Sequence, residues 1–405
     1  MTVRILPALA RGSVVLPPSK SLLQRRLIAA ALCPPASGES RVLPLCSSQD
    51  IAAIRRCLQA VGVSVDAQTG KVRGCLPSDW NAATLDCGES AATLRFLIPL
   101  AAVSGREFRF TGSVRLFARP LDVYAAIAAQ QGTRFSLDAD GLTVAGRWKP
   151  GRFAVDCRVS SQFLSGLMMA LPLMDGDSEI ILLGDPVSRP YAAMTADILR
   201  QSGIALTGQD DRVVIPGRQT YRPLHSPVEA DMSAAAVFAA LNMLGGQVAF
   251  DTPGVTGQAD ALYREYYPAL IVCSPTLDVT DTPDLTMLLM ALAALYNGVT
   301  LTGTGRLRYK ESDRAENMAA ELRRFGARVT VEDDRVTVVP AALHSVSGAV
   351  DAHGDHRIAM ALAVVCSQLG GEITGAESVA KSYPGFWDDL RKVGIPVEER
   401  GERRL

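Results

Sequence analysis

Basic side chains recur in this chain just before or beside segments that are rich in Ala, Leu and Met. Each of these side chains is a candidate ligand for a phosphate or a carboxylate group. The residues are Lys20, Arg25, Arg95, Arg119, Lys310, Arg314, Arg357 and Lys381. Carboxylates stand among them: Asp50, Asp284, Glu311 and Asp355. Many cations together with a few carboxylates suit acid–base chemistry on a substrate that carries several negative charges.

The charge balance requires that an anionic ligand be held locally. The formal net charge is −1, so no global basic field points to nucleic acid or to a membrane surface. The apolar segments predict helices, and the first turn of a helix offers unpaired N–H groups and the positive end of a dipole. A single basic residue is usually solvated surface, so the prediction of an anion site depends on the recurrence of cations beside helix starts.

These loops belong to an internal repeat of about seventy residues, a period typical of proteins built from stacked supersecondary units. Six segments share a short strand-like run, a polar loop and an apolar helix. The residues just before the six helices are Lys20, Glu89, Ser160, Asp231, Asp284 and Asp355. The steps between them are 69, 71, 71, 53 and 71 residues, so the fourth unit is short.

A second helix and a hairpin complete each unit. The second helices are amphipathic, which predicts an outer position, and several stop at a glycine, as helix ends often do. Residues 134–146, 204–217 and 328–340 each read as a β-hairpin, and the fourth unit has none. The predicted plan is β-α-β-α-β-β, used six times, with the first helix of each unit buried on all sides.

Length and composition favour a two-domain α/β protein. The chain has 405 residues, of which 48% are hydrophobic and 20% charged, and one core rarely grows to that size. Its eight cysteines form no C-x-x-C pair and only four histidines occur, so we expect reduced thiols, no metal site and a cytoplasmic location. Cys87 and Cys157 are expected to be small buried residues, and we expect neither a signal peptide nor a membrane span.

Several motifs, taken together and in order, resemble the 5-enolpyruvylshikimate-3-phosphate synthase family. The resemblance covers residues 17–387, nearly the whole chain. The motifs are PSKSLLQRRL at 18–27, RLFARPL at 115–121, VSSQFLSGL at 159–167, VSRPY at 187–191, TPDLTM at 282–287, RLRYKESDR at 306–314, GDHRIAMA at 354–361 and KSYPGFW at 381–387.

The resemblance implies a fold and an activity. The fold is the two-lobed enolpyruvyl-transferase fold, an α/β architecture resembling an inverse α/β barrel, with three β-α-β-α-β-β units in each lobe. Lobe I would comprise residues 1–18 and 229–405, lobe II residues 19–228, and a cleft would close between them. The activity is transfer of the enolpyruvyl group from phosphoenolpyruvate to shikimate 3-phosphate with release of phosphate, by a monomer that needs no cofactor and binds neither nucleic acid nor membrane.

The resemblance also implies the site residues. Shikimate 3-phosphate would be bound by Lys20, Ser21, Arg25, Ser160, Ser161, Gln162, Ser188, Asp284 and Lys310. Phosphoenolpyruvate would be bound by Lys20, Ala91, Arg95, Arg119, Gln162, Arg314, Arg357 and Lys381. Asp284 would take the proton from the 5-hydroxyl group, and Glu311, with Lys20 or Lys310 alongside, would deliver a proton to the methylene carbon. Asp284 could instead cap a helix, and Glu311 could simply pair with Arg314 three residues on.

The chain departs from the family pattern at several positions. Glu89 stands where the phosphoenolpyruvate loop of the family has Asn, so its carboxylate must turn away, pair with a cation or be protonated. Ala91 replaces the second glycine of that loop, and within the family this methyl group is associated with poor binding of the inhibitor glyphosate. Arg306 stands where the family commonly has Asn, and Leu22, Leu23 and Gln24 replace a more polar stretch.

Two other interpretations remain open at this point. The enolpyruvyl transferase that acts on UDP-N-acetylglucosamine shares the fold, but that family uses a reactive Cys on a lid loop and a Lys-Asn pair, whereas this chain has RLFARP and Lys20-Ser21. A non-catalytic or altered-substrate member of the fold is suggested by Glu89, by Arg306 and by the missing hairpin.

Overall fold

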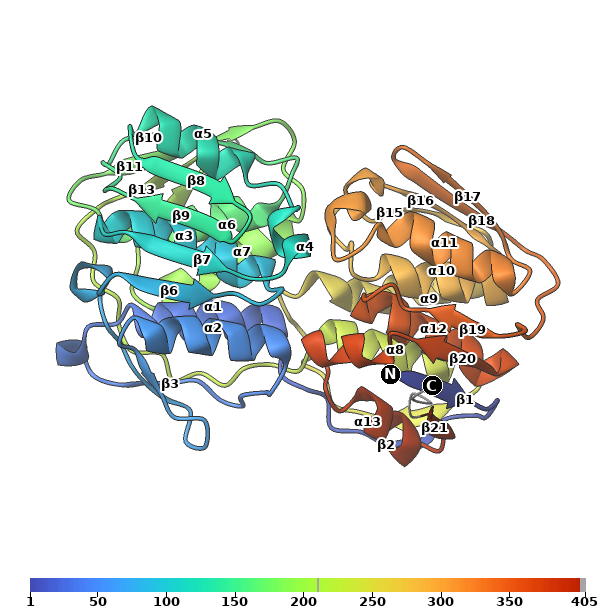
Figure 1. The fold of residues 1–405 in the computed structure, drawn as a ribbon. Coiled ribbons are helices and arrows are strands. Elements are labelled where there is room, and N and C mark those ends of the chain that lie inside the picture. Colours follow the sequence, from blue (N-terminus) through green and yellow to red (C-terminus); the bar gives the residue numbers. More distant parts are fainter. Residues whose placement is uncertain (210, 401–405) are drawn as a thin grey trace. The chain divides into compact units, whose positions relative to one another are not determined.

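The computed structural model describes residues 1–209 and 211–400. The chain forms two compact units, each with its own hydrophobic core. Unit 1 combines Met1–Pro17 with Ala230–Leu405, and unit 2 is the continuous stretch Pro18–Glu229. The chain therefore starts in unit 1, builds unit 2 and then returns to unit 1 (Figure 1). Residues 401–405 of the expected lobe I and residue 210 of one expected hairpin lie outside the described residues.

Unit 2 holds the first three copies of the repeat. The first copy comprises α1 (Lys20–Ala31), β3 (Ser40–Arg41), α2 (Gln49–Ala60), β4 (Ser64–Val65) and β5 (Lys71–Arg73). The second comprises β6 (Ala83–Asp86), α3 (Ala91–Ser104), β7 (Phe108–Thr111), the short α4 (Val114–Phe117), α5 (Asp122–Gln130), β8 (Arg134–Asp138) and β9 (Gly141–Ala145). The third comprises β10 (Arg152–Asp156), α6 (Ser161–Ala170), β11 (Ser178–Leu183), α7 (Arg189–Gln201), β12 (Thr207–Gly208) and β13 (Arg212–Ile215).

Unit 1 holds the other three copies. The fourth comprises β2 (Arg11–Ser13), α8 (Met232–Met243), β14 (Gln247–Ala249) and α9 (Tyr263–Val272). The fifth comprises β15 (Thr276–Asp278), α10 (Thr286–Leu295), β16 (Val299–Thr302), α11 (Arg314–Arg324), β17 (Arg328–Glu332) and β18 (Arg335–Val339). The sixth comprises β19 (Ala349–Asp351), α12 (His356–Leu369), β20 (Gly371–Thr374), α13 (Phe386–Lys392), β21 (Val397–Arg400) and the N-terminal β1 (Thr2–Ile5).

The second, third and fifth copies show the full strand plan. Their sheets have the orders β6-β7-β9-β8, β10-β11-β13-β12 and β15-β16-β18-β17. In each, the first two strands are parallel and the last two form an antiparallel hairpin, for example with Val329 opposite Val338. All three predicted hairpins are thus confirmed, and β15 follows α9 directly, so the fourth copy lacks a hairpin as predicted.

The predicted strand in front of the first helix is wrong. Residues 14–17, which open the VVLPP run, form no strand, and the preceding strand β2 pairs in parallel with β14 of the fourth copy, with Arg11 opposite Gln247. Pro17 and Pro18 lack the N–H groups that a strand ladder needs. The first copy consequently has only the sheet β3-β5-β4, and the fourth copy borrows its leading strand from the N-terminus.

The sixth copy is completed by the other end of the chain. The N-terminal strand β1 lies between β20 and β21 in the order β19-β20-β1-β21 and is antiparallel to both. Its side chains Val3 and Ile5 are fully buried. The local repeat in the sequence could not reveal this strand, because it lies more than 360 residues from its partners.

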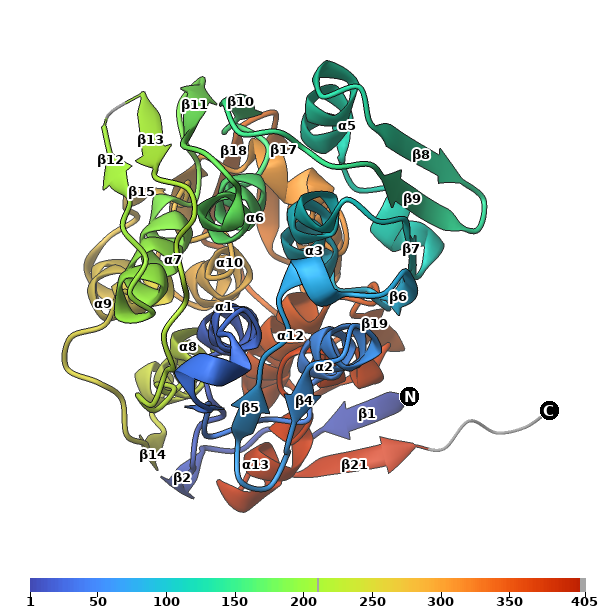
Figure 2. The same cartoon turned by 90° about the vertical axis from the view of Figure 1, so that its left-hand side faces the viewer.

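The six first helices are buried nearly all round, as predicted. In α10 every residue from Thr286 to Ala294 is buried, and in α12 the same holds from His356 to Ser367. Figure 2 shows α1, α3 and α6 of unit 2 nearly end-on, with strands β6–β9 and β10–β13 outside them. The second helices α2, α7 and α11 each bury only one face.

Candidate functional site

The predicted loop residues do stand at the starts of the buried helices. Ser160, Asp231 and Asp355 are the N-caps of α6, α8 and α12, and their side chains accept from the backbone N–H groups of the first turn. The same task falls to Ser19 before α1 and to Ser90 before α3. Each of these helix starts is therefore fixed by its own loop, which also positions the neighbouring charged residues.

The strongest charge arrangement in unit 1 surrounds Arg314. Its side chain is 1% exposed, and it makes three ion pairs. Nε donates to Asp355 at 2.8 Å, Nη1 to Asp284 at 2.7 Å and Nη2 to Glu311 at 2.6 Å. Burial by itself would lower the pKa of this guanidinium group, but the three carboxylates outweigh burial and hold the pKa well above its usual value.

Asp284 is shared by two arginines. Its second oxygen accepts from Nη2 of Arg357 at 2.9 Å, while its first is bound to Arg314. The side chain remains 20% exposed, so one edge of a fixed carboxylate is accessible. The alternative role as a helix cap is wrong, since Leu285 is the N-cap of α10 and no side chain caps that helix.

Glu311 lies in the turn before α11 and is 18% exposed. Its ion pair with Arg314 at 2.6 Å confirms the predicted pairing at a spacing of three residues. A carboxylate that is bound to a buried arginine on one side and exposed on the other has a fixed position and is still accessible.

Two lysines belong to the same region of unit 1. Lys310 is partly buried, and burial lowers its pKa to about 7, although Asp284 acts in the opposite direction. Lys381 is 9% exposed and donates to the carbonyl group of Gly354, directly before the cap residue Asp355, at 2.8 Å. The structure thus brings together, in unit 1, the predicted residues Asp284, Lys310, Glu311, Arg314, Arg357 and Lys381.

Arg357 retains unused hydrogen-bonding capacity. It is the second residue of α12, and its side chain is 7% exposed. Its Nε is buried and has no hydrogen-bond partner among the described residues. Such a donor in the first turn of a helix is well placed to bind an anion.

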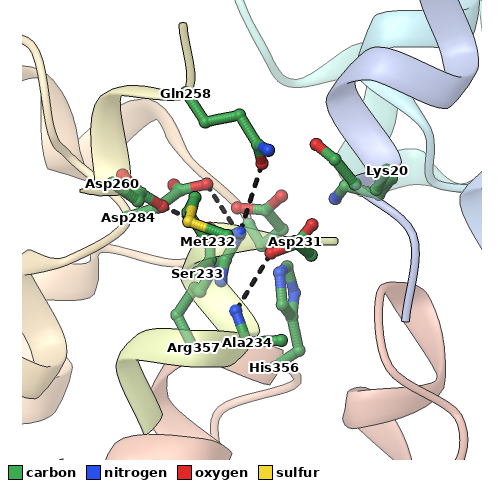
Figure 3. A network of polar contacts seen from close by, with 12 residues as sticks. Lys20, Asp231, Met232, Ser233, Ala234, Gln258, Asp260, Asp284, His356 and Arg357 are labelled. Atoms are coloured by element: carbon green, nitrogen blue, oxygen red, sulfur yellow. Dashed lines mark hydrogen bonds and ion pairs between the residues drawn. The ribbon is translucent and has the colours of Figure 1, made fainter. Parts of the chain in front are cut away.

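A further carboxyl group lies at this place, and no motif in the sequence points to it. Asp260 is 3% exposed and accepts a hydrogen bond from the hydroxyl group of Ser233. Figure 3 shows Asp260 beside Asp284, with Arg357 close to both. Asp260 lies outside every motif and outside the repeat anchors, so only the tertiary structure identifies it.

In unit 2, Lys20 and Arg25 from α1 differ in their surroundings. Lys20 forms an ion pair with Asp50 of α2 at 3.0 Å. The guanidinium group of Arg25 is 3% exposed, donates to Thr195 at 2.7 Å and to the carbonyl oxygen of Ser21 at 2.9 Å, and lies over the ring of Phe96. Burial lowers the pKa of Arg25 to about 10. Arg25 therefore holds α1 against α7 in addition to any contact with a ligand.

Arg95 joins two of the predicted loops. Its Nη1 donates to the side chain of Gln162 at 3.0 Å, and its Nη2 donates to the carbonyl group of Pro120 at 2.7 Å. The guanidinium group lies 4.7 Å from the ring centroid of Phe163. The neighbouring Arg119 has a buried Nε without a hydrogen-bond partner in the described part of the chain.

The serines predicted to bind phosphate lie at the starts of α6 and α7. Ser188, the N-cap of α7, has φ 54°, a left-handed conformation that is uncommon for a residue other than glycine. A pocket of about 520 Å³ is lined by Ser161, Val187 and Arg189, among others. Of the predicted contacts in these two loops, Ser161 lines this pocket, and Val187 and Arg189 on either side of Ser188 line it as well.

The structure also shows the surroundings of the residues at which the chain departs from the family pattern. Glu89 is an exposed residue, and Ala91 is the first residue of α3 with 5% of its surface exposed. Arg306 donates to the carbonyl group of Thr280. Gln24 is buried and donates to Ser90, the cap of α3, at 3.1 Å, which gives the less polar α1 stretch a positioning contact.

Cysteines and membrane segments add no further site. All eight cysteines are free thiols, and Cys87 and Cys157 are buried as predicted. Among residues 1–209 and 211–400, no helix is long and apolar enough to cross a membrane, and no group of His, Cys, Asp and Glu is arranged to hold a metal ion.

The fold and the charge arrangement define a class of protein: a two-unit α/β repeat protein that presents arginines, lysines and helix starts to small anionic ligands. The chain belongs to the EPSP synthase (3-phosphoshikimate 1-carboxyvinyltransferase) family, whose model matches residues 7–255 and 254–390.

Similar proteins cover almost the full chain. A 3-phosphoshikimate 1-carboxyvinyltransferase of Clostridium kluyveri is 36% identical and covers 98% of both chains. The corresponding protein of Methanoculleus marisnigri is 37% identical over 94% of this chain and 96% of its own. Among solved structures, EPSP synthase from Acinetobacter baumannii aligns with a TM-score of 0.77 at 20% identity over 98% and 99% of the two chains. The enolpyruvyl transferase NikO from Streptomyces tendae has the same TM-score at 17% identity, over 98% of each chain. These two likenesses show the shared fold.

Proposed function

We propose that this protein transfers the enolpyruvyl group of phosphoenolpyruvate to the 5-hydroxyl group of shikimate 3-phosphate and releases phosphate, the step of the shikimate pathway that leads to chorismate and the aromatic amino acids. The observation that carries the proposal is Asp284, a carboxylate held at 2.7 and 2.9 Å by Arg314 and Arg357 and still 20% exposed. Membership of the family supplies the reaction class.

We assign the base to Asp284. Two ion pairs hold its carboxylate in one orientation, so it does not need to reorganise when it accepts the 5-hydroxyl proton. Glu311 is held in the same way by Arg314, and Lys310 is close enough for its pKa to respond to both carboxylates. We assign to Glu311, with Lys310 or Lys20, the delivery of a proton to the methylene carbon of phosphoenolpyruvate.

Proton delivery gives carbon 2 of phosphoenolpyruvate cationic character, and the deprotonated 5-oxygen attacks it. The resulting tetrahedral intermediate then expels phosphate and yields the enolpyruvyl ether. Arginines that are already oriented by carboxylates stabilise the negative charge of the departing phosphate without reorganising at that moment. We assign this role to Arg314 and Arg357, of which Arg357 has an unused Nε donor.

We assign the remaining binding roles as the family resemblance implies. Shikimate 3-phosphate is assigned to Lys20, Ser21, Arg25, Ser160, Ser161, Gln162, Ser188, Asp284 and Lys310. Phosphoenolpyruvate is assigned to Lys20, Ala91, Arg95, Arg119, Gln162, Arg314, Arg357 and Lys381. The support is the pocket at Ser161, the unusual backbone of Ser188 and the unpartnered Nε of Arg119. We further propose a cytoplasmic monomer, consistent with eight free thiols.

Phosphate release tests the function directly. Shikimate 3-phosphate and phosphoenolpyruvate together should give stoichiometric phosphate, and either substrate alone should give none. The Asp284→Asn variant should lose about 10²- to 10⁴-fold in kcat, the usual contribution of a positioned base. Asp388→Asn is the matched control, because Asp388 is exposed and forms a surface ion pair with Arg391 at 2.7 Å. Full turnover by Asp284→Asn would remove the base assignment.

A second acceptor is the alternative function. The fold is shared with the enolpyruvyl transferase NikO, and Glu89 departs from the usual loop. If phosphate were released from phosphoenolpyruvate with another hydroxylated acceptor, such as UDP-N-acetylglucosamine, and not with shikimate 3-phosphate, the altered-substrate interpretation would hold. If no acceptor supported release, a non-catalytic role would be the better explanation.

A further inference from the structure

Asp260 is a buried carboxyl group to which the mechanism above assigns no task. It belongs to the short 3₁₀ helix Ala259–Leu262, which leads into α9. Its Oδ2 accepts from the hydroxyl group of Ser233, whereas Oδ1 is buried and has no hydrogen-bond partner among the described residues. A carboxyl group in these surroundings is expensive to ionise unless a charge compensates it.

Structure on both sides fixes the position of Asp260. The side chain of Gln258, the cap of the 3₁₀ helix, accepts from the N–H group of Met232 at 3.2 Å and donates to the carbonyl group of Ala230 at 2.9 Å. Asp231 caps α8 through Ala234 at 3.0 Å. These hydrogen bonds join the short helix to the start of α8. They hold the backbone of Asp260 beside Asp284 and Arg357 (Figure 3).

Charged and titratable groups surround Asp260 and belong to α9, to α12 and to the residues just before α8 and α10. Asp284 precedes α10, Arg357 comes from α12, Asp231 precedes α8, and Tyr267 of α9 donates to the carbonyl group of Ala236 at 3.1 Å. Burial, followed by the charge of Asp284, raises the pKa of Asp260 to about 7, and Arg357 and the bond from Ser233 only partly offset this. Arg357 is thus flanked by Asp284, which is ion-paired with it, and by Asp260, which changes charge near neutral pH.

We propose that Asp260 is a positioning residue that acts through Arg357: its carboxyl group takes up one proton from solvent when a substrate anion binds to Arg357, and so keeps the charge around that arginine balanced. The inference rests on the proposed function, because it takes phosphoenolpyruvate as the anion. An incoming negative charge stabilises the protonated form of a neighbouring carboxyl group. By linkage, a protonated Asp260 favours the bound anion, and an ionised Asp260 opposes it.

The sign of the pH effect follows from this linkage. Below pH 7 Asp260 is already neutral, and binding needs no proton. Above pH 7 the carboxyl group is ionised in the unliganded protein, so each pH unit weakens phosphoenolpyruvate binding by up to about tenfold. Asp260→Asn keeps the size of the side chain and is permanently neutral, so it should bind phosphoenolpyruvate normally at pH 6 and more tightly than the wild type at pH 8.

The test is the KM for phosphoenolpyruvate of the wild type and of Asp260→Asn at saturating shikimate 3-phosphate from pH 6 to pH 9. We expect the ratio of the wild-type KM to the variant KM to rise from about 1 at pH 6 to between about 5 and 10 at pH 8. The ratio isolates Asp260, because both proteins share the titration of the substrate's own phosphate. A ratio that stays constant across this range would overturn the proposal, and Asp388→Asn serves as the matched surface control.

Ser233→Ala gives an independent readout if Asp260→Asn folds poorly. The hydroxyl group of Ser233 lowers the pKa of Asp260, so its removal should move the pH at which KM rises to higher pH. An unchanged midpoint would count against the proposal. A purely structural role for Asp260 would change the KM at all pH values alike and would not move the midpoint.

A stability measurement separates this inference from the proposed function. The pKa of Asp260 is about 7 in the folded protein and about 4 in an unfolded chain, so the folded state binds more protons between these values. The contribution of Asp260 to the free energy of unfolding should therefore fall as pH rises from 4 to 7, and Asp260→Asn should lack this contribution. If the wild type releases no phosphate, the proposed function fails, while equal pH slopes of stability in the two proteins would refute the titration of Asp260 in either case.

Discussion

At the scale of single residues, the site of unit 1 depends on one buried guanidinium group. Arg314 has three carboxylate partners within 2.8 Å, and a buried charge of this kind is tolerable only because it is paired on all sides. The arrangement fixes two partly exposed carboxylates, Asp284 and Glu311. One arginine thereby orients both residues to which proton transfer is assigned.

Lys310 predicts a pH dependence that concerns the other substrate. Burial lowers its pKa to about 7, so the ammonium group that would hold shikimate 3-phosphate is lost as pH rises above 7. The kcat/KM for shikimate 3-phosphate, at saturating phosphoenolpyruvate, should fall by up to about tenfold per pH unit there. In Lys310→Arg the charge persists, so this alkaline fall should be absent even if the absolute rate is lower. Identical alkaline limbs in the two proteins would contradict the assignment.

Ala91 predicts a change in inhibitor sensitivity. Its methyl group sits at the first position of α3, where the family resemblance implies a glycine and a close approach of a ligand to the backbone. Ala91→Gly should lower the concentration of glyphosate that halves phosphate release by about tenfold, which corresponds to relief of ~1.4 kcal/mol of crowding. Ala92→Gly, one residue further on, is the matched control and should leave the inhibition curve unchanged. Equal curves for all three proteins would remove the role of this methyl group.

At the scale of elements, the buried helices place the arginines of unit 2. Helices α3 and α6 pack closely at Gly166, beside Tyr124 of α5. The Tyr124 hydroxyl donates to the carbonyl groups of Arg95 at 2.7 Å and Phe163 at 3.2 Å, one in each helix. Because the side chain of Arg95 bonds to Gln162 of α6, the spacing of the two helices sets the geometry of the predicted binding residues.

Gly166→Ala tests this packing. A methyl group at position 166 would meet the Tyr124 hydroxyl and would lie 2.6 Å from the carbonyl oxygen of Arg95. Overpacking of this kind costs about 1–3 kcal/mol, so urea unfolding should show that loss, and the KM for phosphoenolpyruvate should rise. Gly208→Ala is the control, because nothing lies within 4 Å of its added methyl group. A variant as stable as the wild type would show that α3 and α6 can separate at no cost.

At the scale of the whole molecule, the two units differ in the number of chain segments that build them. Unit 2 is one continuous stretch, whereas unit 1 needs the N-terminal residues as well as the C-terminal half. Strand β1 lies between β20 and β21, and β2 is the only partner of β14 among the described residues. Removal of these two strands would expose the core surface that the buried side chains of Val3 and Ile5 cover. It would also leave the edges of their partner strands unpaired.

A fragment experiment follows from this topology. Residues 18–229 expressed alone should fold and melt cooperatively, because their core draws on no other part of the chain. Residues 230–405 alone should not fold, and fusing residues 1–17 to them through a flexible linker should restore a cooperative thermal transition by circular dichroism. Cooperative folding of 230–405 without the N-terminal segment would contradict the role assigned to β1 and β2.

Features that arise from local patterns could be predicted without the structure. Apolar helical segments, glycine stops and hairpins recur along the chain, so the repeat, the buried helices and the missing fourth hairpin could be predicted from it. The motif residues that carry charge could be named for the same reason, since each stands at a fixed place beside a helix start. Glu311 and Arg314 could even be paired, because they are three residues apart.

Which distant residues meet depends on how the whole chain packs. The partners of β1 lie near the other end of the chain, and β2 leaves the first copy to complete the fourth, because Pro17 and Pro18 cannot continue a strand ladder. Arg314 contacts residues thirty and forty-one positions away. Asp260 lies in no motif, and its pKa depends on burial and on the charge of Asp284. Burial is a property of the packed core, and no local sequence pattern records it.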